Sequence, residues 1–270
     1  YSSAASDVYK RQSLYRIFVI QYIKTTMQSK VDFFIGLSGF LISQAAGLAF
    51  LYLVFEQIPS MQEWSLEQML FIYGFAQLPR GIDHLLTDNI WMVGWQMVIK
   101  GTFDKYILRP MNIFFQIVCE KVQFDALGEI LVGLVLVGRA VANGTVQVTP
   151  VKLLFFIISI TAGAIIYTAV KLILASIAFW LKDSSAIMTT AYEVADFAKY
   201  PTEIYAKPIQ VILMTILPFA FVAYIPSTFF LIDANIWKTI GAECVVAVVI
   251  WIVAYKIFQK GISVYESAGN

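Results

Sequence analysis

The strongest constraint on the fold of this chain is a stretch without a single charged residue, from Phe33 to Phe55. Similar apolar runs extend from Leu153 to Val170 and from about Thr239 to Ile257. A helix needs about 20 apolar residues to cross the hydrocarbon core of a bilayer, and these runs have about that length. Only 14% of the residues are charged, against about 25% in soluble domains. The sequence therefore excludes a water-soluble globule and predicts an all-α integral membrane protein.

Charge and residue usage exclude several functional classes. Lys and Arg (19) nearly balance Asp and Glu (18), so the chain offers no basic surface for nucleic acid, and the lipid bilayer is its expected medium. It has no P-loop motif, and its single histidine, His84, cannot supply the paired ligands of a metallopeptidase. Cys119 and Cys244 lie in apolar runs, as buried thiols do. We expect no catalytic residue and no metal site.

Six membrane spans are predicted. Besides the three apolar runs, spans are expected at about Leu66–Ile90 and Ile113–Val137, each apolar in one half and polar in the other. The remaining span is either 184–200, which carries charged residues, or 209–231, which is uncharged but contains two prolines. Hydropathy alone favours 209–231. If only one of the two segments crosses, the basic loops and both termini lie on the cytoplasmic side.

The N-terminal region differs in composition from the rest. Residues 1–12 lack an initiator Met and are interpreted as a non-native scar, which leaves 13–270 as a single transmembrane domain. Residues 13–30 place apolar and basic side chains at helical spacing, a pattern typical of an amphipathic helix on the membrane surface. No cleavable signal peptide is expected, because the first apolar stretch is long enough to be a span.

Charged residues inside the predicted spans form two helical stripes. Arg80, His84 and Asp88 recur at intervals of four residues. The same spacing relates Lys121, Asp125 and Glu129. Each such charge costs about 2.5–3.5 kcal/mol on insertion scales, so it faces a partner or an aqueous cavity. The stripes indicate either a polar pathway or, as we prefer, mutual neutralisation of the two spans.

One further intramembrane charge has no local partner in the sequence. Lys171 follows the uncharged run that ends at Val170. A lone lysine at that depth faces a cavity or a distant acidic group. We expect Lys171 to face a cavity.

The loop from Trp91 to Pro110 has the pattern of a protein-docking element. Its first half is amphipathic and rich in aromatic residues, Gly101 marks a turn, and a helix restarts near Asp104. Such an element can seat its side chains in a partner protein.

Several segments together resemble one known family. They are Lys100–Pro110 (KGTFDKYILRP), Phe124-Asp125 with Gly128, Ala178–Trp180 (AFW) with Asp183–Ser185 (DSS), Tyr200-Pro201 with Ile204-Tyr205, Ile216–Pro226 (ILPFAFVAYIP) and Lys260–Asn270 (KGISVYESAGN). In order and spacing the chain resembles the type-2 (ABC-2) permeases of ATP-binding-cassette exporters, in particular a bacterial subfamily formerly described as a domain of unknown function. The resemblance covers nearly all of the chain after residue 12.

This resemblance implies a transport subunit that is not itself an enzyme. It implies a dimer of permease chains, the same or homologous, with two separate ATPase subunits that hold ATP and magnesium, so that this chain needs no cofactor. It also implies a multi-pass protein of the bacterial cytoplasmic membrane with an N-terminal interfacial helix and a cytoplasmic coupling helix. Finally, it favours Ser184–Tyr200 as the fifth span, followed by a re-entrant element on the outer side.

The resemblance also assigns residues to roles. The residues implied in ATPase coupling are Trp95, Lys100, Gly101, Phe103, Asp104, Leu108, Arg109 and Pro110. The prolines implied in the re-entrant gate are Pro201, Pro208, Pro218 and Pro226. The family is usually richer in arginine in the coupling loop, whereas this chain has Lys100 and Lys105, so planar guanidinium contacts would depend on Arg109.

The function expected from these features is outward movement of an amphiphilic or drug-like substrate by alternating access, powered by the ATPase. A secondary transporter is the main alternative, but paired broken helices in an internal repeat are not evident. A membrane enzyme would need a nucleophile or a metal cluster, and a passive membrane scaffold would need neither.

Overall fold

The computed structural model describes residues 30–267, with side chains from Phe34 onward. This part of the chain is helical and contains no strand. The segment 1–12, and all but the last residue of the predicted interfacial helix, lie outside the described residues.

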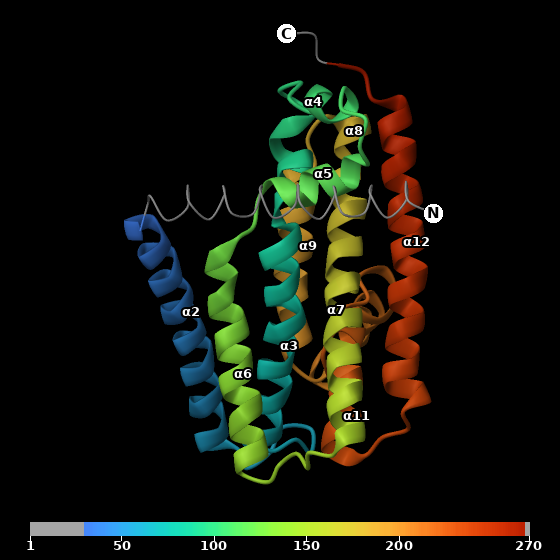
Figure 1. Cartoon of the computed structure of the whole chain (residues 1–270). Helices are drawn as coiled ribbons and strands as arrows, with labels where there is room; N and C mark the ends of the chain where they lie inside the picture. Colours follow the sequence, from blue (N-terminus) through green and yellow to red (C-terminus); the bar gives the residue numbers. More distant parts are fainter. Residues whose placement is uncertain (1–29, 268–270) are drawn as a thin grey trace, which may run out of the picture.

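Long helices stand side by side and form the body of the molecule (Figure 1). They are α2 (Lys30–Gln57), α3 (Leu66–Thr87), α6 (Leu127–Ala142), α7 (Pro150–Ser176) and α12 (Ala242–Val264). The shorter elements are η2 (Asp88–Ile90), η3 (Val93–Met97), α4 (Asp104–Ile107), α5 (Ile113–Glu120), η4 (Phe124–Ala126), α8 (Ala178–Leu181), α9 (Ser185–Ala195), η5 (Asp196–Lys199), η6 (Thr202–Ile204), α10 (Lys207–Val211), η7 (Ile212–Ile216), η8 (Phe219–Phe221), α11 (Tyr224–Ile232) and η9 (Trp237–Gly241).

Three of the described helices are long and apolar enough to cross a membrane. They are Phe34–Gln57, Pro150–Leu181 and Trp237–Val264. A fourth crossing is present only if the pair Lys207–Ile216 and Phe219–Ile232, which is bent by 76°, is taken as one span. The all-helical membrane class is therefore confirmed, whereas six spans remain a prediction.

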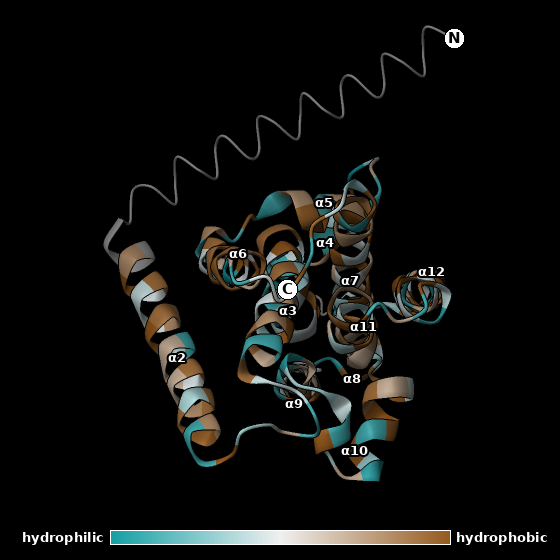
Figure 2. Ribbon diagram, turned by 90° about the horizontal axis from the view of Figure 1, so that it is seen from below, coloured by the Kyte–Doolittle hydropathy of each residue, from teal (hydrophilic) through white to brown (hydrophobic). Residues whose placement is uncertain are grey.

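The helices differ in how far they are enclosed. Half of the apolar window of α7 is buried (50%), against 11% for α2. Seen along the bundle, α3 and α7 lie in the middle, with α2 and α12 at opposite edges (Figure 2). The central position of α3 and α7 explains why these two helices can share polar contacts away from the apolar outer surface.

α3 and α6 approach each other through glycine. A Cβ at Gly74 would lie 2.5 Å from Cβ of Leu136, and a Cβ at Gly133 would lie 2.6 Å from the Leu78 side chain. No side chain larger than hydrogen fits at either position without displacing the neighbouring helix. This contact holds the polar end of α3 beside that of α6, where Nδ1 of His84 lies 3.0 Å from Oε1 of Glu129.

The predicted continuous span Ile113–Val137 is wrong. The chain leaves the helical conformation after α5, with Lys121 extended, and α6 begins only at Leu127. The break has a tertiary cause, because Asn89 donates its side-chain amide to the backbone oxygen of Ile117 (2.8 Å), and Gln123 donates its backbone N–H to the backbone oxygen of Leu85 (3.0 Å). Contacts with η2 and the end of α3 thus replace hydrogen bonds of a continuous helix.

The two candidate fifth spans differ in shape. α9 begins beside η3, where Ser184 donates its backbone N–H to the Gly94 oxygen (2.9 Å). After η5 the chain reaches the first half of α3, where the rings of Tyr200 and Tyr73 lie 6.3 Å apart. The segment 207–232 instead folds back on itself at a break near Pro218.

One end of the bundle is closed by short helices. η3, α4, α5 and α8 gather there, and the chain after α12 ends on the same side (Figure 1). Their shared core contains Phe103, Tyr106, Phe179 and Phe258. We call this end the capped end.

Candidate functional site

A buried ion pair lies at the centre of the bundle. Nζ of Lys171 in α7 lies 2.8 Å from Oδ2 of Asp83 in α3, and neither side chain is exposed. The same ammonium lies 3.5 Å from Oδ1 of Asp88. The ammonium of Lys171 therefore neutralises acidic side chains of α3 and η2. The expectation that it faces a cavity is wrong.

Asp83 is further held by hydroxyl groups. Thr87 and Thr168 donate to its Oδ1 at 2.6 and 2.8 Å. Tyr192 of α9 donates to Oδ2 at 3.1 Å. A buried carboxylate costs several kcal/mol unless it is paired and hydrogen-bonded, and here α3, α7 and α9 together supply those partners.

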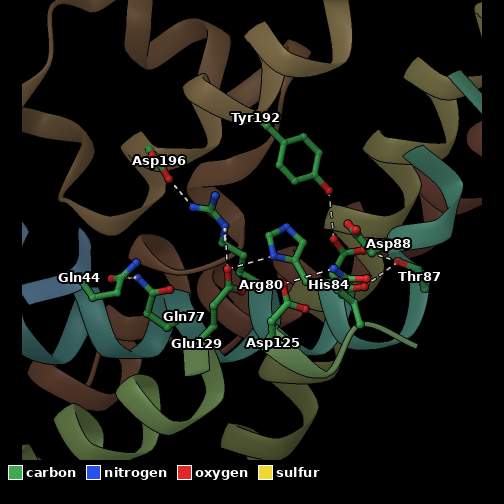
Figure 3. Close-up of polar contacts among 12 residues, drawn as sticks. Gln44, Gln77, Arg80, His84, Thr87, Asp88, Asp125, Glu129, Tyr192 and Asp196 are labelled. Atoms are coloured by element: carbon green, nitrogen blue, oxygen red, sulfur yellow. Dashed lines mark hydrogen bonds and ion pairs between the residues drawn. The ribbon is translucent and has the colours of Figure 1, made fainter. Parts of the chain in front are cut away.

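A second group of charges lies one turn away along α3. Arg80 forms an ion pair with Asp196 and lies 3.8 Å from Glu129. Nδ1 of His84 lies 3.0 Å from Oε1 of Glu129, and Lys199 lies 3.0 Å from Asp196. Figure 3 shows the side chains of Arg80, His84, Glu129 and Asp196 converging from α3, α6 and η5. We refer to both groups together as the charged cluster.

The charged cluster brings together most of the predicted intramembrane residues. Arg80, His84 and Glu129 meet there as the neutralisation hypothesis requires. Asp125 lies in η4 and Lys121 in the extended segment before it, so the predicted stripe of three residues on one helical face is wrong. Among the described residues, Lys121 takes no part in an ion pair.

Sequence reasoning missed part of this cluster. Tyr192 and Thr168 carry no charge, so nothing in the sequence marks them as ligands of a carboxylate. Asp196 was visible as a charge in a weak span, but its partner Arg80 lies 116 residues away in the sequence. Only the packing of η5 against α3 joins them.

The predicted coupling loop has an inner part that belongs to the capped end. Phe103 and Tyr106 are fully buried. The Phe103 ring lies 5.0 Å from that of Phe179 in α8 and 5.1 Å from that of Tyr265 after α12. Gly101, with φ of 68°, provides the turn that precedes them, because a left-handed backbone favours glycine. These positions anchor the loop to α8 and the chain end.

Asp104 links the loop to the last described residues. Tyr265 donates to its Oδ1 at 2.9 Å and Ser267 to its Oδ2 at 2.5 Å. Burial, together with this hydrogen bond and the charge of Asp104, raises the pKa of Tyr265 to about 12. The carboxylate thus acts as a fixed acceptor for the C-terminal segment.

A second carboxylate stabilises the loop from α5. Glu120 lies 2.5 Å from Nζ of Lys105 and accepts a hydrogen bond from Tyr106. Burial and this hydrogen bond raise the pKa of Tyr106 above its ordinary range. The short helix α4 is therefore fixed to α5 by side chains, although it has only four residues.

The outer part of the loop is exposed. Trp95 and Leu108 are 53% and 83% exposed. The other exposed residues of this part are Ile99, Lys100, Thr102, Ile107, Arg109 and Pro110. Trp180 and Leu181 of the adjoining α8 are exposed as well. Apolar and basic side chains together form this surface, which we call the loop face.

Gly94 locks the loop to the start of α9. A Cβ on Gly94 would lie 2.4 Å from Sδ of Met188 and 2.6 Å from Oγ of Ser184. Its backbone oxygen accepts the N–H of Ser184, the residue before α9. Asp183 precedes this point, and the backbone N–H of Ser185 that donates to it holds the pKa of that carboxyl below its usual range. The loop and α9 are thus packed as one unit.

The predicted gate prolines lie at helix ends and breaks. Pro201 precedes η6, and Pro208 lies in the first turn of α10. Pro218 stands between η7 and η8, where the 76° bend occurs, and Pro226 lies in the first turn of α11. Their positions explain the broken shape of 207–232, because proline lacks the N–H that a continuous helix needs.

Metal chemistry finds no support in this arrangement. Among residues 30–267 no group of His, Cys, Asp and Glu side chains is arranged to hold a metal ion. The carboxylates of the charged cluster are instead paired with lysine, arginine and hydroxyl groups.

Comparison with known proteins identifies the family. A family model described as ABC-2 family transporter protein matches residues 41–269. No curated protein and no solved structure matches the chain. The matched range includes the charged cluster, the predicted coupling loop and the bent segment, and it confirms the resemblance seen in the sequence. The chain belongs to the ABC-2 transporter family.

Proposed function

We propose that this chain is the permease subunit of an ATP-driven exporter, working as a dimer with separate ATPase subunits. ABC-2 proteins are membrane components of ABC transport systems, which are driven by an ATPase. In this proposal the chain hydrolyses nothing, ATP and magnesium bind to the partner, and an amphiphilic or drug-like substrate moves outward by alternating access.

The observation that carries the proposal is the exposed loop face on a rigid support. Leu108 and Trp95 project from a loop whose inner residues Phe103 and Tyr106 are fully buried. Exposed apolar side chains on a fixed element are typical of a protein interface. Arg109 adds a guanidinium that can pair with a carboxylate in two hydrogen bonds. The loop face is therefore the proposed ATPase docking surface.

A continuous set of contacts leads from the loop face into the bundle. The loop packs on α9 at Gly94, and α9 carries Tyr192, which donates to Asp83. Asp83 in turn joins α3 to α7 through Lys171. A rigid displacement of the loop by the ATPase would therefore move α9 against α3 and α7, as alternating access requires.

The same proposal assigns the membrane orientation. The capped end is placed on the cytoplasmic side of a bacterial cytoplasmic membrane, with both chain termini on that side. Ser184–Tyr200 is then the fifth of six spans, and 207–232 enters and leaves from the outer side with Pro218 near its innermost point. Two observations support this arrangement. The segment 184–200, which contains α9 and η5, begins at Gly94 and ends at Tyr73, and Asp233 after α11 pairs with Lys152 in the first turn of α7 (2.7 Å).

The dimer is proposed to use the loosely packed edge of the bundle. Only 11% of the apolar window of α2 is buried within this chain. A helix of that kind faces lipid or another protein, and a second permease chain would cover it.

The test is extraction of the tagged full chain from native membranes in mild detergent, with mass spectrometry of bound proteins. We expect a P-loop ATPase in near-stoichiometric amount. The double variant Leu108→Asp, Arg109→Glu should lose it and still reach the membrane. The matched variant Trp237→Asp, Lys238→Glu, exposed at the opposite end, should retain it. Recovery of the chain alone, under conditions that preserve other membrane complexes, would favour a secondary transporter or a scaffold.

A further inference from the structure

A cavity of about 250 Å³ opens beside the charged cluster. It lies between α2, the end of α3, η4 with the start of α6, and α9. Its lining residues are Phe40, His84, Asp88, Trp91, Gln123, Asp125, Ala126, Glu129 and Tyr192. We call it the acid–aromatic cavity.

The lining of this cavity is acidic. Three carboxylates, Asp88, Asp125 and Glu129, contribute to it, and no lysine or arginine does. The neighbouring cations are shared with other carboxylates. Lys171 lies closer to Asp83 (2.8 Å) than to Asp88 (3.5 Å), and Arg80 pairs with Asp196 besides lying 3.8 Å from Glu129. Asp125 accepts an amide hydrogen bond from Gln123 at 3.3 Å and forms no ion pair within residues 30–267. The cavity therefore presents negative charge that the cluster does not neutralise.

Glu129 supplies an independent sign of a missing partner. Glu129 is 6% exposed, and its Oε1 contacts His84 and Arg80. Its Oε2 is buried and has no hydrogen-bond partner in the part of the chain that the structure describes. Oε1 of Gln123, also on the cavity wall, is in the same state. A buried acceptor of this kind costs about 1–3 kcal/mol, which a bound donor would recover.

Aromatic rings form the rest of the wall. Trp91 and Tyr192 meet edge to face with centroids 4.8 Å apart, and the His84 ring stacks on Tyr192 at 5.7 Å. Phe40 faces them from α2. Aromatic faces beside carboxylates attract organic cations through the ring quadrupole and direct charge pairing.

Inorganic divalent cations fit this site poorly. Among residues 30–267 no three His, Cys, Asp or Glu side chains converge closely enough to hold a metal ion. An organic cation needs no such convergence, since its charge is spread over a larger volume and its carbon groups can contact the rings.

We propose that the acid–aromatic cavity binds the ammonium group of an organic cation, either a free amine or the amine of a lipid headgroup. Oε2 of Glu129 accepts a hydrogen bond from the ammonium, and Asp125 and Asp88 supply further negative charge. Trp91 and Tyr192 enclose the carbon groups of the cation. The binding step goes beyond the proposed function and requires no ATPase, so its failure would leave the permease proposal untouched.

The test is calorimetric titration of benzylamine, protonated at neutral pH, into the full chain in nanodiscs of phosphatidylglycerol only, with empty discs subtracted. N-Benzylacetamide, which keeps the benzyl group but has no charge, is the ligand control. Glu129→Gln should weaken binding by about tenfold or more, because a charge-paired contact is lost. Glu193→Gln makes the same change at an exposed position of α9 and should leave affinity unaltered. Asp125→Asn, at a half-buried position in η4, provides a second variant should Glu129→Gln fail to fold.

The two sources of the amine are separated by changing the lipid. Discs containing phosphatidylethanolamine should weaken apparent binding if a headgroup occupies the cavity, and leave it unchanged if the ligand is a free amine. Either result upholds the site. Equal binding of N-benzylacetamide, unaltered affinity in the folded variants Glu129→Gln and Asp125→Asn, or no binding at millimolar ligand would overturn it.

Discussion

The ammonium of Lys171 and the carboxylate of Asp83 lie 2.8 Å apart with both side chains fully buried, and this pair joins α7 to α3 at the centre of the bundle. Each group depends on the other for neutralisation. Removing one partner leaves a buried charge, which is far more costly than removing both.

The first prediction concerns this pair. Lys171→Met should destabilise the chain by about 3–5 kcal/mol, because Asp83 is left buried and unpaired. Lys171→Met combined with Asp83→Asn should recover a large part of that loss, since the amide can still contact Thr87 and Thr168. Thermal unfolding in detergent measures both, with Lys260→Met, at an exposed position of α12, as the control. Equal losses in the single and double variants would show that the pair is not coupled.

Gly94 gives a second prediction, on the joint between the loop and α9. Gly94→Ala should destabilise the capped end by about 1–3 kcal/mol, because its Cβ would overlap Met188 and Ser184. Gly138→Ala is the matched control, since nothing lies within 4 Å of a Cβ there. Protease sensitivity of the loop should rise in the first variant only. Equal stability and equal protease sensitivity in the two variants would contradict a close contact of Gly94 with Met188 and Ser184.

The third prediction is a pH dependence at the chain end. Because the pKa of Tyr265 is raised to about 12, above the ordinary value near 10, its contact with Asp104 contributes stability that is complete below about pH 10. That contribution is lost as the pH rises through about 12. The measurement is tyrosinate absorbance after a rapid pH jump, with the absorbance of Tyr265→Phe subtracted from that of the wild type. The difference should have its titration midpoint near pH 12.

In the same titration, Asp104→Asn should move the Tyr265 midpoint toward its ordinary value, since the negative charge beside the phenol is removed. A wild-type midpoint already near pH 10 would contradict the docking of the C-terminal segment on the loop.

The fourth prediction tests the orientation proposed for the segment after α9. In a background with Cys119 and Cys244 replaced by alanine, Ala206→Cys should react with an impermeant thiol reagent added outside intact cells. Lys182→Cys should react only after the membrane is opened. Both positions are exposed. Labelling of Ala206→Cys from the cytoplasmic side alone would reverse the assignment of 207–232 as an outer re-entrant element.

The long uncharged segments made part of the fold predictable. α2, α7 and α12 could be predicted because apolar runs of that length are stable only in lipid or in a helical core. The interruption after α5 could not be predicted, because it depends on Asn89 and Gln123 reaching across to other segments. Local periodicity continues through residues 113–137 whether or not such contacts form.

The polar site was predictable in kind but not in its pairing. Charges within spans have to be neutralised, and the predicted neutralisation between the two charged stripes agrees with the contact of Arg80 with Glu129. Lys171 lacked a partner within its own helix, and its true partner Asp83 lies on a helix that becomes adjacent only after folding. For the coupling loop, the sequence did not separate Phe103, which is buried, from Leu108, which is exposed.

The central claim is that the loop face docks an ATPase, and site-specific photo-crosslinking in living cells tests it most directly. A photoreactive benzophenone amino acid would replace Leu108, which is 83% exposed, and in a matched strain Trp237, which is 80% exposed at the opposite end. We predict a crosslinked product at position 108 that contains a P-loop ATPase, and none at position 237. Crosslinks to lipid or to this chain alone at both positions would contradict the account.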